Sequence, residues 1–461
     1  MSKTIKLKRG FDINLAGKAE KKIANVPLSK TFAIKPTDFA GMERPKVLVQ
    51  EGDTVEAGTP VLFDKKMDGI MYTSPVSGEV AEVRRGEKRK LLEVIILADE
   101  EVKYKQFPHG KMSVSDIKNL SSDDARSIMM ESGVWPNILQ RPFAIVADPA
   151  EEPKSIFISA FDSSPLGPDY DFLFKDQEKY FQAGVDVLQK FTSGAIHVNI
   201  DGSAEVSNLY AHTKGIEINK FSGKYRHPLG NVGVQIHHID PIRKGDIVWA
   251  INPFGVIQIG KLFLEGRYDA SKLVAVAGAE VQKPQYYKTY SGACVSKLLE
   301  KNLNHQENIR VISGNVLSGE KISKDGYLGF YDHLVTVIPE GNKPRFFLTE
   351  GWLAPTKRLS FHRAFGLLSF LKGKNDYVLD TSVNGEERAF VMTGAFEEVT
   401  PMDILPMHLV KAIMAEDFDD MEALGIYEVA PEDLALCEFI DVSKHDIQDI
   451  IRQGIKMIRE A

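Results

Sequence analysis

The sequence predicts an α+β protein of several domains. Three observations support this prediction: short apolar runs with glycine turns follow Pro45, strand-like and helix-like runs then alternate, and helical spacing dominates after Pro401. A chain of 461 residues can hold several cores, at roughly 100–200 residues per domain. We divide it into an N-terminal arm (1–44), a β domain (45–105), a Rossmann-like α/β domain (106–267), a smaller α/β unit (268–350) and a helical domain (351–461).

The composition of the chain argues against several classes of function. The net charge of -7 provides no basic surface of the kind that nucleic-acid binding needs. No apolar run approaches the ~18 residues that cross a bilayer, and the charged N-terminus lacks the apolar core of a signal peptide. We therefore expect a cytoplasmic protein that can dock on a membrane protein. Two cysteines, Cys294 and Cys437, are too few for an iron–sulfur cluster, which usually takes four.

The β domain contains SPVSGEVAEVRRGEKRKLLEVII, residues 74–96, which resembles half of a biotinyl or lipoyl barrel-sandwich module. Short strands with Gly-Asp and Gly-Thr-Pro turns fit that compact fold. In such modules a hairpin tip carries the modified lysine. Here Met67 aligns with that lysine and Lys66 lies one residue away, and a one-residue shift turns a strand side chain to the other face. We expect a structural barrel without a covalent cofactor.

In the α/β domain, Ser121 and the acids after it predict a helix start. Strands are predicted at PFAIVAD, SIFISAF, AIHVNID, GVQIHHID and IVWAINPFGVIQIGKLFL, and a helix over Gln177–Phe191. On a strand, His237 and His238 point to opposite faces and cannot share a metal ion. Gly255 to Leu262 has the spacing of a P-loop, but it lacks the Mg²⁺-binding hydroxyl and is expected to be a strand.

The remaining segments predict a loop, strands and helices. The loop from Asp162 to Tyr170 follows a predicted strand, where α/β domains often bind ligands, but its composition fits an ordinary turn. YYKTYSGACVSKLLEKNL predicts a strand or loop that leads into a helix, and NIRVISGNVLSG and HLVTVIPE predict strands. After Pro401 we expect helices. The last is expected to be capped by Ser443 with Asp446 and to place its isoleucines on one face.

The whole chain resembles the NqrA family, which belongs to the bacterial sodium-translocating NADH:quinone oxidoreductases. The segments that carry the resemblance are the barrel stretch above, GVQIHHIDPIRKGDIVWAINPFGVIQIGKLFLEGRYD, NIRVISGNVLSG and PMDILPMHLVKAIMAED, in this order along the chain. The resemblance implies a central domain related to the flavoprotein subunit of complex I and to the C subunit of the Rnf complex. It also implies a β-grasp domain and a C-terminal helical bundle.

The resemblance further implies a subunit with no tightly bound redox group. Trp135, Pro136 and Asn137 stand where relatives have the glycines of a flavin loop, and Cys437 alone remains of a Cys-x-x-Cys-x-x-Cys run. The implied partners are subunits B to F, especially a membrane-embedded one, at the cytoplasmic face of the inner membrane. The complex couples NADH oxidation and quinone reduction to sodium export. This chain is then a peripheral subunit that binds quinone, ubiquinone or menaquinone, or serves as a scaffold.

A quinone head needs a flat apolar slot with a few hydrogen-bond donors at its carbonyls. Aromatic faces supply such a slot, and lysine, histidine or backbone N–H groups supply donors. The candidates near the former flavin region are Trp135, Phe143, Phe161 and Tyr170, and Phe32 with Lys35 in KTFAIKPTDF form a second group. Core packing or a solvated surface is the competing interpretation for all six. No catalytic residue or metal ligand is expected in this chain alone.

Two other functions compete with this interpretation. A biotin or lipoate carrier predicts a mass shift on Lys65 or Lys66. A nucleotide-dependent dehydrogenase predicts NAD binding by the isolated chain, but the sequence contains neither Gly-x-Gly-x-x-Gly nor a complete P-loop.

Overall fold

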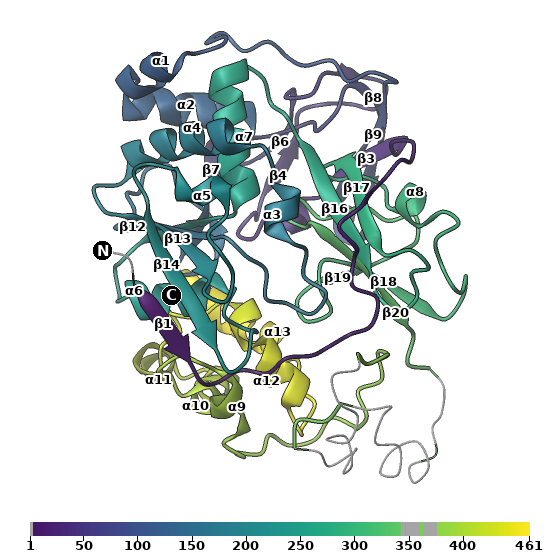
Figure 1. The fold of residues 1–461 in the computed structure, drawn as a ribbon, viewed down its shortest axis with the longest axis vertical. Coiled ribbons are helices and arrows are strands. Elements are labelled where there is room, and N and C mark those ends of the chain that lie inside the picture. Colours follow the sequence, from purple (N-terminus) through teal and green to yellow (C-terminus); the bar gives the residue numbers. More distant parts are fainter. Residues whose placement is uncertain (1–2, 343–345, 347–358, 363–375) are drawn as a thin grey trace.

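The computed structural model describes residues 3–342, 346, 359–362 and 376–461. Its centre is a seven-stranded sheet in the order β1-β14-β13-β12-β15-β10-β11 (Figure 1). Five strands run parallel, and β10 is antiparallel to both its neighbours. The strands are β1 (Thr4–Leu7), β10 (Leu139–Arg141), β11 (Ile145–Val146), β12 (Ser155–Ser159), β13 (Ile196–Asp201), β14 (Glu217–Gly223) and β15 (Val248–Ile251).

Helices surround this sheet. β12 and β13 are buried along almost their whole length, as expected for parallel strands that are covered on both faces. α4 and α7 pack against each other, and α6 packs on β12. The expected cap of α2 is present, because Ser121 Oγ accepts a hydrogen bond from the Asp124 N–H. The helices are α1 (Val114–Asn119), α2 (Ser122–Ser132), α3 (Tyr170–Leu173), α4 (Glu178–Leu188), α5 (Asn208–Ala211), α6 (Val232–Ile239) and α7 (Pro253–Glu265).

The strand prediction for the run after Ile251 is wrong, because this run forms α7. Asn252 caps it, its side-chain oxygen accepting a hydrogen bond from the Gly255 N–H at 2.8 Å, and Pro253 begins it. α7 is buried on nearly all sides, which removes the polar stripe that marks a surface helix. The P-loop-like spacing from Gly255 onward therefore lies inside a buried helix.

The strand prediction for GVQIHHID is also wrong, because this segment is α6. Periodicity does not separate a short buried helix from a buried strand in so short an apolar run. Tertiary packing decides here: Ile236 joins a buried cluster with Phe157 and Val248 of the sheet.

The β domain consists of two small sheets, in the orders β3-β9-β8-β5 and β4-β6-β7. Lys65 and Lys66 form the exposed turn between β6 and β7. The strands are β3 (Thr31–Ile34), β4 (Pro45–Val47), β5 (Thr54–Val55), β6 (Pro60–Asp64), β7 (Met67–Thr73), β8 (Gly78–Arg85) and β9 (Leu91–Ala98).

Residues 1–44, expected as an extended arm, add an edge strand to each of three sheets. β1 pairs with β14, β2 (Ile23–Ala24) pairs with β17, and β3 pairs with β9. This N-terminal segment therefore ties the barrel to both other sheets. The domain boundaries themselves stay a prediction.

A six-stranded sheet in the order β19-β18-β20-β16-β17-β2 follows the central one. It contains the strands predicted from NIRVISGNVLSG and HLVTVIPE and has its own buried cluster around Val274, Val276 and Val337. Its elements are β16 (Ser271–Ala277), β17 (Gln285–Tyr290), α8 (Ser296–Leu299), β18 (Ile309–Ser313), β19 (Glu320–Ile322) and β20 (Leu334–Pro339).

The predicted C-terminal helices are present, and Figure 1 shows them grouped beside the central sheet. The cap assigned to Ser443 is wrong: the last helix follows Asp446, and Ser443 is buried and donates to the Ala389 carbonyl. Within the described ranges, no helix is long and apolar enough to cross a membrane. The helices are α9 (Ala395–Val399), α10 (Pro406–Met414), α11 (Phe418–Ala423), α12 (Ala435–Ile440) and α13 (Ile447–Glu460).

Candidate functional site

A narrow cavity, which we call the slot, lies where the barrel, the end of α2 and the six-stranded sheet meet. It holds about 380 Å³ of empty space, part of it open to solvent. The barrel contributes residues from β3, from the short 3₁₀ turn Pro36–Asp38 and from the end of β7. The other wall comes from segments distant in sequence. The ring-bearing residues that line the slot are Phe39, Tyr72, Pro75, Pro136, Tyr268 and Phe330.

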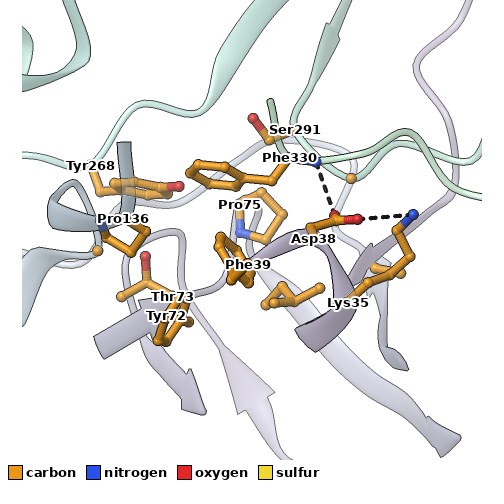
Figure 2. Close-up of a pocket in the computed structure, with 14 residues that line it drawn as sticks. Lys35, Asp38, Phe39, Tyr72, Thr73, Pro75, Pro136, Tyr268, Ser291 and Phe330 are labelled. Atoms are coloured by element: carbon orange, nitrogen blue, oxygen red, sulfur yellow. Dashed lines mark hydrogen bonds and ion pairs between the residues drawn. The ribbon is translucent and has the colours of Figure 1, made fainter. Parts of the chain in front are cut away.

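Rings make the slot flat and apolar. Figure 2 shows Tyr268 and Phe330 on one side and Pro136, Pro75 and Phe39 on the other. Phe39 and Phe330 pack against each other, with ring centroids 4.9 Å apart. A planar ring that entered beside this pair would contact aromatic and proline faces.

Two glycines allow the backbone to approach closely beside the slot. Gly133 ends α2 with a φ of 85°, and a Cβ there would lie 2.1 Å from Thr73 Oγ1. Gly292 has a φ of 71°, and a Cβ there would lie 2.1 Å from the Ala33 carbonyl oxygen. Any other residue at either position would therefore be strained and would push the walls apart.

One end of the slot is charged. Lys35 Nζ lies 3.0 Å from Asp38 Oδ1 and 2.9 Å from Glu320 Oε2. Asp38 Oδ2 also accepts a hydrogen bond from the Phe330 N–H at 2.9 Å. Burial raises the pKa of Asp38 to about 6, although the Lys35 ammonium opposes this rise. Burial lowers the pKa of Lys35, but the carboxylates of Asp38 and Glu320 outweigh it and raise that pKa overall.

Hydroxyl groups complete the lining. Ser291 is 3% exposed, and its Oγ has no hydrogen-bond partner. Tyr268 is buried too, and burial raises the pKa of its phenol to about 12, so it stays protonated. A buried hydroxyl without a partner is costly, and a ligand carbonyl would satisfy the one on Ser291.

A second, wider cavity, which we call the crevice, opens at the carboxyl ends of β12 and β15. It encloses about 1150 Å³ of empty space, part of it open to solvent. Half of its lining residues are polar, among them Asn137, Asp162, Ser164, His227, Asn231 and Asn252. Burial lowers the pKa of His227 to about 4, so this ring is neutral, and its Nε2 has no partner.

Three of the predicted site residues lie in or near the slot, each in a different position. Lys35 lines the slot directly. Phe32 lies in the core of the barrel, with its ring edge-on to Tyr290 at 6.1 Å, while its neighbours Ala33 and Ile34 line the slot. Trp135 is fully buried, and its indole N–H donates to the Ala147 carbonyl at 2.8 Å.

The other three predicted site residues lie away from the slot. Phe161 and Tyr170 line the crevice. Phe143 follows Pro142 with a φ of 84° and packs edge-on against Tyr427, and it lines neither cavity. The six candidates are therefore not brought together into one site.

Sequence reasoning missed most of the slot. Phe39 lies within KTFAIKPTDF, close to Lys35, and an aromatic residue next to a charged turn could have drawn notice. Tyr268 follows α7, Ser291 follows β17, and Phe330 precedes β20. Nothing in their local sequences indicates that they meet.

Several other sequence features have structural explanations. His237 Nδ1 lies 2.9 Å from Glu428 Oε2, and His238 Nε2 lies 2.7 Å from the Pro401 carbonyl, so both rings have partners and join α6 to the C-terminal region. The expectation that they point to opposite faces of a strand is wrong, because they lie on a helix with ring centroids 5.1 Å apart. Cys294 and Cys437 are both free and buried, and burial raises the pKa of Cys437 to about 12. In the part of the chain that the structure describes, no group of three His, Cys, Asp or Glu residues could hold a metal ion.

Three protein-family models match the chain in order. They are the NqrA N-terminal barrel-sandwich hybrid domain at residues 5–99, the NqrA second alpha/beta domain at 120–268, and the NQRA C-terminal domain at 273–324. These matches confirm the barrel-sandwich module and the α/β domain that follows it. A crystal structure of NAD+-reducing [NiFe]-hydrogenase in the air-oxidised state gives a TM-score of only 0.36 at 11% identity, over 78% of this chain and 67% of that one, and supports no conclusion.

Full-length relatives match over nearly the entire chain. The NqrA subunit of the Na(+)-translocating NADH-quinone reductase from Serratia proteamaculans is 36% identical over 99% of both chains. The corresponding protein from Neisseria meningitidis serogroup A is also 36% identical over 99% of both. The resemblance seen in the sequence is thereby confirmed, and this chain belongs to the NqrA family of Na(+)-translocating NADH-quinone reductase subunits.

Proposed function

We propose that this chain acts as the peripheral NqrA subunit of a sodium-translocating NADH:quinone reductase and binds the quinone head in the slot. The complex couples NADH oxidation and quinone reduction to sodium export. In this proposal the electrons reach the quinone from redox groups of other subunits, because the present chain has only two cysteines, both buried, and lacks the glycines of a flavin loop.

The observation that carries the proposal is the combination of ring faces and hydrogen-bond donors in one narrow cavity. A quinone is a flat ring with two opposed carbonyl acceptors. Phe330 and Tyr268 on one side and Phe39 with the prolines on the other offer faces for such a ring (Figure 2). The buried hydroxyl of Ser291 and the ammonium of Lys35 are donors suited to its carbonyls.

The narrowness of the slot limits what it can take. Its roughly 380 Å³ includes space open to solvent, so a single flat ring suits it better than a dinucleotide, and the Phe39 and Phe330 rings must separate to admit that ring between them. The crevice is wider, and half of its lining residues are polar, which suits an apolar ring less.

The remaining parts of the proposal rest on the family. We infer that the six-stranded sheet contains a β-grasp domain and that the central sheet is related to the flavoprotein subunit of complex I. The partners are subunits B to F, including a membrane-embedded one, at the cytoplasmic face of the inner membrane. Ubiquinone carries a benzoquinone head and menaquinone a larger naphthoquinone head, and both present two opposed carbonyls to the donors of the slot.

The test is photoaffinity labelling of the assembled complex with a short-chain azidoquinone, followed by peptide mapping. We expect labelled peptides to contain residues 33–39, 268, 291–292 or 330, and excess ubiquinone-1 to suppress the labelling. Labelling confined to other subunits, or to the crevice residues 161–170, would refute the proposal. A matched variant, Ser291→Ala, should weaken labelling without moving it.

A further inference from the structure

A row of three ionisable side chains connects the slot to the protein surface. Asp38 lines the slot, with its side chain 9% exposed, and lies 3.0 Å from Lys35, whose side chain is 6% exposed. Lys35 in turn lies 2.9 Å from Glu320, whose side chain is 60% exposed. The row thus runs from the buried cavity to bulk water in two short steps.

Other charged groups near Asp38 are held by their own contacts. Lys272 Nζ donates to the main-chain carbonyls of Phe330 and Asp332. The Asp332 carboxylate accepts a hydrogen bond from Ser313 Oγ, and Tyr331 donates to the Pro136 carbonyl. All three residues influence the charge on Asp38, but none of them provides a link to the surface.

Asp38 is placed to carry a proton. Each carboxylate oxygen accepts one hydrogen bond, from Lys35 or from the Phe330 N–H, and keeps a second lone pair. Burial raises the pKa of this carboxyl to about 6, which brings it close to neutral pH. A carboxyl used only to neutralise Lys35 would not need to line the cavity.

Quinone reduction in the slot needs a proton source beside the ring. A quinone that gains two electrons must also gain two protons, and a carboxyl in the wall holds a proton at a fixed place next to that ring. The electrons come from the reduced redox carriers of the other subunits, but the protons must arrive through this chain if its slot holds the ring.

We propose, on the basis of the function proposed above, that Asp38 is the proton donor to the quinone oxygen and that Glu320 and Lys35 return protons to it from water. The O–H bond of the Asp38 carboxyl breaks, a new O–H bond forms on the reduced quinone oxygen, and a carboxylate remains. Glu320 takes a proton from bulk water, and Lys35 gives one proton to Asp38 as it takes that proton from Glu320, so the charges of Lys35 and Glu320 are both unchanged after the step. A second passage supplies the second proton of the quinol.

The test uses the assembled complex and measures quinone reduction by NADH against pH. Asp38→Asn keeps the shape of the side chain but cannot donate an acidic proton. We expect kcat to fall by about 100-fold or more, in line with the loss of a general acid, with KM within about twofold. In the wild type, kcat should decline above about pH 6, and this decline should disappear in D38N. Asp38→Glu should restore part of the rate.

The control is Asp246→Asn, because Asp246 pairs with Lys154 at 2.9 Å and lines neither cavity. This variant should keep the wild-type rate and pH profile. Wild-type kcat and pH dependence in D38N would overturn the inference. If D38N does not assemble, Glu320→Gln decides: a several-fold lower kcat supports the proton path, and an unchanged kcat overturns it.

Azidoquinone labelling of the same D38N complex separates the two proposals. Slot labelling with a wild-type rate would refute proton delivery alone. Absence of slot labelling in both wild type and D38N would refute the binding site itself.

Discussion

The slot and the crevice differ in position, width and lining residues. The crevice lies at the carboxyl ends of parallel strands, the place where α/β sheets usually bind ligands, yet it is wide and half of its lining residues are polar. The slot lies outside that position, at a junction of three substructures, and its lining is aromatic and narrow. The comparison teaches that topology and surface chemistry can point to different places in one fold, and we propose that the ligand binds where the chemistry points.

Each cavity also has a buried ion pair in its wall, and the two pairs differ in kind. Beside the slot, Lys35 bonds Asp38 and the exposed Glu320. Beside the crevice, Arg141 pairs with Glu432 and lies 3.2 Å from the buried Asp433. An arginine keeps its proton at all working pH values, whereas a lysine can pass one on as it takes another, as proposed for Lys35 between Glu320 and Asp38. We therefore interpret the Arg141 pair as a structural clamp and the Lys35 pair as functional.

The largest expected effect is a loss of stability when the Arg141 clamp is broken. Arg141→Met leaves Asp433, which is 4% exposed, without its partner and releases β10 from the turn Pro431–Leu434. We predict a loss of about 3–5 kcal/mol in stability, measured as a shift of the urea-unfolding midpoint. Lys154→Met, which breaks a more exposed pair, should cost no more than about 1 kcal/mol. Equal losses in the two variants would contradict the clamp.

The next largest effect is the pH dependence of folding stability that Asp38 causes. The folded pKa of Asp38 is about 6, above the ordinary value of 3.8, so this group stabilises the fold at low pH and loses that contribution as pH rises from about 4 to about 6. The total is on the order of 3 kcal/mol. Relative to Asp38→Asn, the wild type should therefore lose stability over this window in chemical denaturation.

The control for the pH prediction has the opposite sign. The hydrogen bond from Lys154 lowers the pKa of Asp246, so the contribution of Asp246 is present at neutral pH and is lost as pH falls. Wild type compared with Asp246→Asn should therefore gain stability as pH rises. If stability changed with pH in the same direction in both comparisons, burial would not be the cause of the raised pKa of Asp38.

A smaller effect tests ligand choice between the cavities. Phe330→Ala removes one face of the slot and should weaken quinone binding about tenfold, or roughly 1.4 kcal/mol, the size of a good ring contact. Phe161→Ala makes a matched change in the crevice and should alter affinity by less than about twofold. Binding of ubiquinone-1 to the assembled complex measures both. A larger loss of affinity in Phe161→Ala than in Phe330→Ala would place the quinone in the crevice.

The smallest effect is at the tip of the barrel hairpin. Lys66 pairs there with Glu43, and the two side chains are 52% and 36% exposed. Lys66→Ala should change stability by no more than about 1 kcal/mol. Intact-mass spectrometry of the native protein should give the unmodified mass, because we expect the barrel to carry no cofactor. An added biotinyl or lipoyl mass on Lys65 or Lys66 would contradict this and revive the carrier hypothesis.

The parts that could be predicted from sequence were those with local signals. Gly-Asp turns revealed the barrel strands, and Ser121 revealed the start of α2. α7 was missed because it is buried on nearly all sides, although Asn252-Pro253 and Gly266 mark its ends. Lys35 was a candidate because lysines can donate to quinone carbonyls, and the structure places it in the wall of the slot. The slot itself could not be predicted, because Tyr268, Ser291 and Phe330 come together only through long-range packing.

The most direct test of the slot is hydrogen–deuterium exchange of the assembled complex with and without a short-chain quinone. We predict slower amide exchange at residues 32–39, 291–292 and 328–331 when the quinone is present, with no change at 162–170 and 227–232. Protection of the crevice segments with no change around the slot would contradict the assignment.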